Sequence, residues 1–91
     1  MTVTYKGMTN DFQYRIAEIN FDEEIETTLV NMVVFFMEKV KGYKVDVATS
    51  GYAVCEVEDK KEFTTFAREW REAVKMIKKL YEVWILVLTY L

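Results

Sequence analysis

The chain has 91 residues and carries 15 acidic against 12 basic side chains, so its net charge is −3. This length leaves room for one domain, residues 1–91, and one hydrophobic core. A mildly acidic chain lacks the cationic excess of a general nucleic-acid binder, so no direct nucleic-acid contact is expected. A single cysteine, no signal-peptide pattern and no apolar run of about 20 residues predict a cytoplasmic protein without a membrane segment.

The first well-marked element is residues 12–19. Phe12, Tyr14 and Ile16 alternate with polar residues, which predicts a half-buried strand. A helix is the alternative, because part of the segment also fits a 3.6-residue period. Residues 1–6 are predicted to form a short extra strand that leads into this one.

A helix is predicted next, with Asp22 as its N-cap and Gly42 just beyond its end. Its apolar positions recur at helical spacing, namely Ile25, Leu29, Met32, Val33, Phe36 and Val40. Val30, Val34 and Met37 widen the apolar arc to about 200°, beyond the roughly 100° that a one-sided helix needs. These three residues are either buried against other elements or form an exposed patch for dimerisation or partner docking.

A β-hairpin follows the helix. Two alternating runs are joined by a predicted three-residue loop, residues 49–51, with Gly51 in the left-handed conformation at its third position. This loop length pairs like faces of the two strands: Val47 with Ala53, Val45 with Cys55 and Tyr43 with Val57.

Asp59 is predicted to cap a second, amphipathic helix. Residues 83–91 can be read in two ways, of which we favour a strand. Their β-branched and aromatic content is typical of a buried strand. A helix is the alternative, because no Gly, Asn or Pro precedes them and Trp84, Leu88 and Leu91 continue the helical stripe. With the strand, the fold is α+β with a ferredoxin-like β-α-β-β-α-β order and both helices on one face of a small sheet. Without it, the order is ββαββα with a long last helix.

The composition removes most catalytic chemistry. There is no histidine, no glycine-rich phosphate loop and no set of ligands for zinc, so neither an enzyme nor a metal or cofactor site is expected. Cys55 alternates with core residues in its strand, and we therefore interpret it as a small buried hydrophobic residue.

Acidic residues follow the first and third strands of the predicted ferredoxin-like sheet. We expect these strands to run parallel, which would gather one negative surface from Asp22, Glu23, Glu24, Glu58, Asp59 and Glu62. Such a surface could occupy a basic groove of a nucleic-acid-binding enzyme or complex. The alternative is helix capping with solvated charge.

In size, charge and missing catalytic apparatus, the chain resembles the compact acidic accessory proteins of phages and mobile elements, anti-CRISPR-like inhibitors included. That resemblance implies a non-enzymatic module that inhibits or adapts a host macromolecular complex through a protein partner, in the host cytoplasm if the protein is phage-encoded. A small-ligand-binding regulatory homodimer of the ferredoxin-like type is the alternative function. The sequence leaves both the monomer and the homodimer open.

Overall fold

The structure is a computed structural model in which residues 1–7, 15–21, 24–48 and 50–91 are described. The chain folds into a four-stranded sheet and two helices, which confirms the predicted α+β class. In chain order the elements are β1 (Thr2–Lys6), β2 (Arg15–Asn20), α1 (Glu24–Lys39), β3 (Val45–Ala48), β4 (Tyr52–Val57) and α2 (Lys60–Tyr90).

The sheet has the order β1-β2-β4-β3, and each neighbouring pair is antiparallel. The extra N-terminal strand is confirmed as β1, which pairs along the whole of β2 except its first residue. The predicted strand at residues 12–19 is confirmed from Arg15 onwards, while Phe12 and Tyr14 lie outside the described residues. Ala17 and Ile19 face the core, so Ile16 lies on the opposite, open face of the sheet.

The expectation that the strands before the two helices run parallel is wrong, because β2 and β4 are antiparallel. The reason lies in the connections. Helix α1 returns the chain so that β3 runs in the same direction as β2, and the β3–β4 hairpin then reverses it. Strand β4, which lies between β2 and β3, therefore opposes both of them. Arg15 at the start of β2 therefore lies opposite Val57 at the end of β4.

The hairpin has the predicted three-residue loop, since Ala48 pairs with Tyr52. Val45 and Val47 pair with Cys55 and Ala53 as expected. Gly51 has φ of +76°, and a Cβ there would collide with the carbonyl oxygen of Phe21. The Phe21 N–H donates to the Gly51 carbonyl oxygen at 2.9 Å, which ties the end of β2 to this turn.

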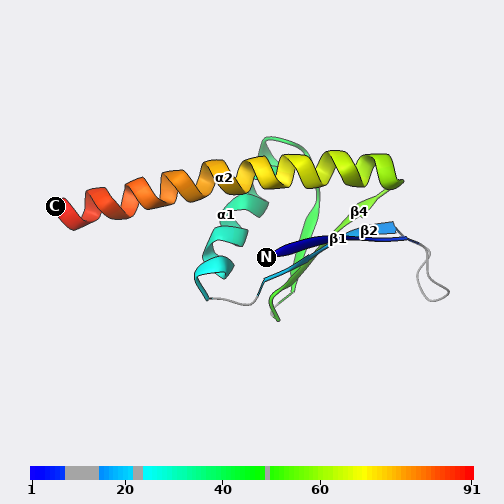
Figure 1. Ribbon diagram of the computed structural model, residues 1–91, viewed down its shortest axis with the longest axis horizontal. Helices are drawn as coiled ribbons and strands as arrows, with labels where there is room; N and C mark the ends of the chain where they lie inside the picture. The colour runs from blue at the N-terminus through cyan, green and yellow to red at the C-terminus, as the bar shows by residue number, and fades with distance from the viewer. Residues whose placement is uncertain (8–14, 22–23, 49) are drawn as a thin grey trace.

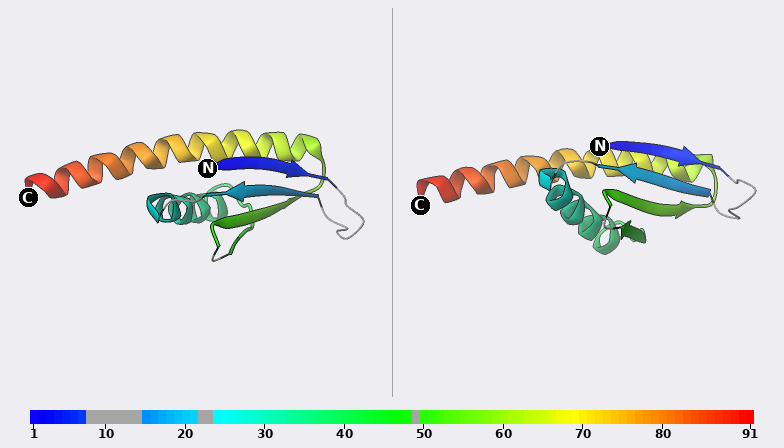
Figure 2. Two further views of the ribbon diagram at one scale, coloured as in Figure 1. Left: turned by 60° about the horizontal axis from the view of Figure 1, so that its bottom comes forward. Right: turned by 90° about the horizontal axis from the view of Figure 1, so that it is seen from below.

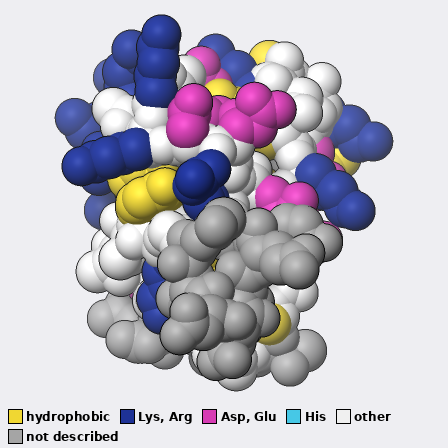
Figure 3. All heavy atoms as spheres, turned by 90° about the vertical axis from the view of Figure 1, so that its right-hand side faces the viewer, with side chains coloured by type: hydrophobic (Ala, Val, Ile, Leu, Met, Phe, Trp, Pro, Cys, Tyr) yellow, Lys and Arg dark blue, Asp and Glu magenta, His cyan; other side chains and the backbone are white. Residues whose placement is uncertain are grey.

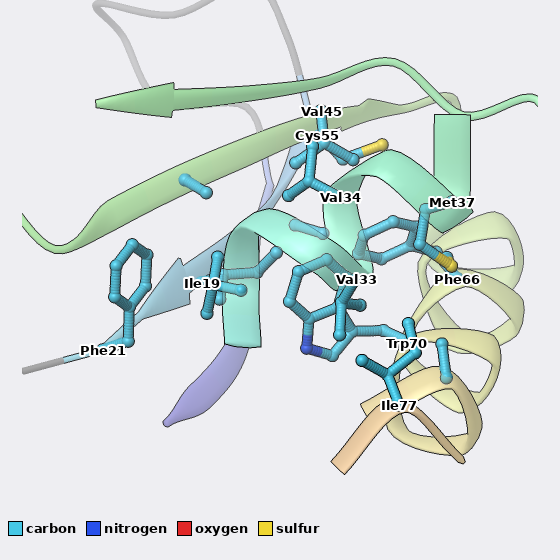
Figure 4. Packing of buried hydrophobic residues seen from close by; sticks show 14 of the residues in the cluster. Ile19, Phe21, Val33, Val34, Met37, Val45, Cys55, Phe66, Trp70 and Ile77 are labelled. Atoms are coloured by element: carbon cyan, nitrogen blue, oxygen red, sulfur yellow. The ribbon is translucent and has the colours of Figure 1, made fainter. Parts of the chain in front are cut away.

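Both helices pack on one face of the sheet and share one core. Trp70 and Phe66 of α2 are the largest fully buried side chains, and Figure 4 shows Trp70 beside Val33 of α1. Val34 points towards Val45 and Cys55 of the sheet (Figure 4). The core is thus built from α1, α2 and the same-face residues of β2, β3 and β4.

The favoured terminal strand at residues 83–91 is wrong, because α2 continues as one helix from Lys60 to Tyr90. Edge strand β1 occupies the place beside β2 that a terminal strand would have taken. The ββαββα alternative therefore describes the order of elements. Figure 1 shows α2 crossing the sheet and then extending beyond it, and both views in Figure 2 agree.

The predicted N-cap of α2 is confirmed at Asp59, whose Oδ1 accepts a hydrogen bond from the Glu62 N–H at 2.8 Å. Glu62 reaches back, and its Oε2 accepts from the Glu58 N–H at 3.1 Å. The first bond satisfies a backbone donor that the first helical turn would otherwise leave unpaired, and the second fixes the residue that precedes the cap.

We expect Asp59→Ala to lower the free energy of unfolding by about 1 kcal/mol, because the Glu62 N–H loses its acceptor. Asp59→Asn keeps an acceptor oxygen and should retain most of the stability. Urea denaturation of both variants measures the difference. Equal stability of Asp59→Ala and the parent chain would show that this cap contributes nothing.

Candidate functional site

The predicted acidic surface cannot form from the ends of β2 and β4. Because the strands are antiparallel, β2 ends at the β3–β4 turn, whereas Glu58 follows β4 at the opposite end of the sheet. Asp22 and Glu23 lie outside the described residues, and Glu24 is the first residue of α1. The topology thus brings Glu58, Asp59 and Glu62 together but separates this group from the chain that leaves β2.

The remaining acidic group is engaged in local structure. Asp59 and Glu62 bind backbone N–H groups at the start of α2, and the Glu58 carbonyl oxygen accepts from Arg15 Nη1 at 2.8 Å. Figure 3 looks at the end of the molecule where α2 begins, and its acidic side chains lie among Lys and Arg side chains. These observations favour the capping role for Asp59 and Glu62.

The interpretation of Val30, Val34 and Met37 as an exposed docking patch on α1 is wrong, and the alternative of burial holds. Val30 and Met37 are fully buried, and Val34 is 9% exposed. Their burial against the sheet and α2 explains the wide apolar arc of this helix. Two other apolar residues of α1, Met32 and Phe35, face outwards instead.

Among the residues whose burial is described, most of the exposed large apolar side chains lie on the part of α2 that extends beyond the sheet. We call residues 80–91 the arm. Leu80 and Trp84 are each 60% exposed, and no residue from Val83 onwards carries a charge. Apolar side chains are exposed all around this helix, including Ile85 and Leu86 on the side away from Trp84.

One continuous stripe connects the arm with the core. Its residues follow each other at alternating steps of three and four, the spacing of a coiled-coil core. We call this stripe the α2 seam, and it consists of Phe63, Phe66, Trp70, Ala73, Ile77, Leu80, Trp84, Val87 and Leu91. From Phe66 to Ile77 the seam is buried in the core, whereas from Leu80 to Leu91 it is exposed.

Two adjoining hollows run between α1 and α2 beside this seam. The first, of about 510 Å³, is lined by Thr28, Asn31, Met32, Phe35, Phe36 and Ile77. The second, of about 400 Å³, is lined by Met32, Leu80, Tyr81, Val83, Trp84 and Val87. Met32 borders both, so together they form one apolar groove, which we call the α1–α2 groove.

The sequence contains a signal for this site. The three-four spacing of the seam continues without a break past Ile77, and Glu82 is the last charged residue. Favouring a strand for residues 83–91 gives this continuity no weight, because a strand presents alternate residues to one face rather than the seam positions.

The open face of the sheet carries a polar network centred on Glu18. Its carboxylate accepts from the Tyr52 hydroxyl at 2.9 Å and from Asn20 Nδ2 at 3.2 Å, and Lys6 Nζ lies 3.3 Å away. Burial acts to raise the pKa of Glu18, but these hydrogen bonds and the Lys6 charge outweigh it and lower the pKa. The network links β1, β2 and β4 through polar contacts between neighbouring strands, so we interpret it as structural.

Cys55 is buried in β4, as the sequence indicated. Burial raises the pKa of its thiol to about 12, and the negative charges of Glu62, Asp46 and Glu56 act in the same direction. The thiol therefore stays protonated near neutral pH and is a poor nucleophile.

We expect a thiol reagent at pH 8 to label native Cys55 far more slowly than the same chain in denaturing urea. The free energy of unfolding should also fall as the pH rises above about 9, because the unfolded thiol then loses its proton and the folded one keeps it. Cys55→Ala should lose this part of the pH dependence. Rapid labelling of the native chain would contradict the burial.

Among the described residues, no group of three or more His, Cys, Asp or Glu side chains is placed to hold a metal ion. Within the same part of the chain, no helix combines the length and apolar character that crossing a membrane requires. Comparison with protein-family models, curated proteins and solved structures finds no match for this chain.

Proposed function

We propose that this chain is a non-enzymatic protein-binding module whose binding element is the arm of α2. The observation that carries the proposal is the exposed half of the α2 seam, with Leu80 and Trp84 each 60% exposed on a helix that extends beyond the core. A helix that is apolar all around is normally buried. An exposed apolar surface of this kind is typical of an interaction site.

The chemistry of the arm favours a protein as the partner. Nucleic-acid binding needs cationic side chains, and the arm has none from Val83 onwards. An apolar helix with anchors at seam spacing suits helix-in-groove recognition, in which apolar side chains of one chain enter an apolar groove of another. We therefore propose that the arm binds an apolar helical surface of a protein chain.

The wider role that we propose is the one suggested by the sequence, an inhibitor or adaptor of a host macromolecular complex. This wider role no longer rests on an acidic surface, since the two acidic segments follow strands that end at opposite sides of the sheet. The ligand-binding regulatory homodimer stays the alternative function.

Photo-crosslinking in the native cell tests the proposal. We expect a benzophenone amino acid at the exposed arm residue Leu88 to form discrete protein adducts, identified by mass spectrometry. The same group at Arg68, an exposed position in the body half of α2, is the matched control and should form none of them. Adding Trp84→Glu should abolish the Leu88 adducts, because a charge cannot enter an apolar groove without a large desolvation cost.

Two outcomes would contradict this function. One is the absence of any protein adduct from Leu88, and the other is an adduct with lipid alone. Adducts that persist unchanged with Trp84→Glu would also show that the seam is not the contact surface.

A further inference from the structure

We infer that the arm binds a second copy of this chain, and that the two α2 helices pair antiparallel through the exposed half of the seam. This inference rests on the proposed function and names the partner of the same site. Its first support is the register of the seam. Phe66, Trp70 and Ile77 use it to pack on their own core, and Leu80, Trp84 and Leu91 continue it with nothing in the described chain covering them.

The second support is that one chain supplies both halves of the contact. The arm is an apolar helix, and the α1–α2 groove is an open apolar hollow, lined by Leu80 and Trp84 of the arm itself and by Met32 of α1. Ile77 and Leu91 are separated by roughly 21 Å along the helix, at 1.5 Å per residue. If the two-fold axis passes near Trp84, Leu91 of one copy lies opposite Ile77 of the other, at the hollow lined by Met32 and Phe35.

An isologous contact of this kind uses the same surface twice, which is the commonest arrangement of homodimers. Each arm would cover the exposed seam of its partner, and its last turn would cover the outward-facing residues Met32 and Phe35 of the partner's groove. The contact would thereby bury apolar side chains of α1 that the core leaves exposed.

Space favours the antiparallel direction. In a parallel pair, the two bodies, each packed on the seam from Phe66 to Ile77, would compete for one place. The antiparallel pair places the two bodies at opposite ends.

The mass of the full chain in solution is the first test. We expect light scattering to give twice the 10.8 kDa chain mass at micromolar concentration. Leu80→Glu places a charge on the seam and should give the monomer. Leu86→Glu makes the same exchange at a position of similar exposure, 57% against 60%, but on the other side of the arm, and should leave the dimer intact. Circular dichroism of both variants checks that the helix persists.

Spin-label distances test the direction without touching the seam. In a Cys55→Ala chain, each copy carries one spin label, either at Lys75 or at Glu82. The distance between the two labels of the dimer is measured for each position. An antiparallel pair centred at Trp84 separates the two Lys75 labels by roughly 27 Å along the axis and the two Glu82 labels by only about 6 Å. A parallel pair would give the same separation at both positions and would overturn the inference.

The outcomes also separate this inference from the proposed function. A monomer at every concentration, or a dimer that survives Leu80→Glu, overturns the inference. If the Leu88 crosslink then joins a different protein, only the self-association fails. A monomer whose arm binds phospholipid vesicles, with no protein crosslink, overturns both.

Discussion

The packing of α2 on the sheet holds the described structure together. Trp70 and Phe66 fill the space between the two helices and the inner face of the sheet, and the Trp70 Nε1–H donates to the Met1 sulfur at 3.4 Å. Strands β2 and β4 and helix α1 contribute smaller side chains to this centre, such as Ala17, Ala53 and Val33. Because large side chains from α2 face small ones from the sheet, the helix can lie close to the strands and fix their common face.

This packing also explains why the arm is exposed. The sheet supports α2 only as far as Ile77, while the helix continues to Tyr90 with the same stripe of apolar residues. Burying one Leu, Val or Phe side chain is worth roughly 1.5–3 kcal/mol. A helix that leaves Leu80, Trp84 and Leu91 in water therefore forgoes several such contributions, and another protein surface can supply them.

Much of the fold could be predicted from local sequence. The Gly51 turn, the Asp59 cap and the register of the hairpin follow from backbone conformation and alternation, which act over a few residues. The direction of β4 relative to β2 could have been deduced as well. A helix between two strands of one sheet returns the chain so that β3 runs in the direction of β2, and the hairpin then reverses it before β4. The prediction of one acidic surface was wrong for this reason. It assumed that β2 and β4 run parallel, and no property of the carboxylates themselves brought its two halves together.

Residues 83–91 show why the functional site was harder to predict than the fold. Valine, isoleucine and tryptophan in close succession indicate burial, and a central strand and an all-round apolar helix satisfy that composition equally well. What separates the two is periodicity over a longer window, and the seam keeps its three-four spacing from Phe63 to Leu91. Composition therefore predicted burial, whereas the structure leaves these side chains exposed. Composition could not indicate this, because the limit of the sheet at Ile77 is a property of the tertiary structure.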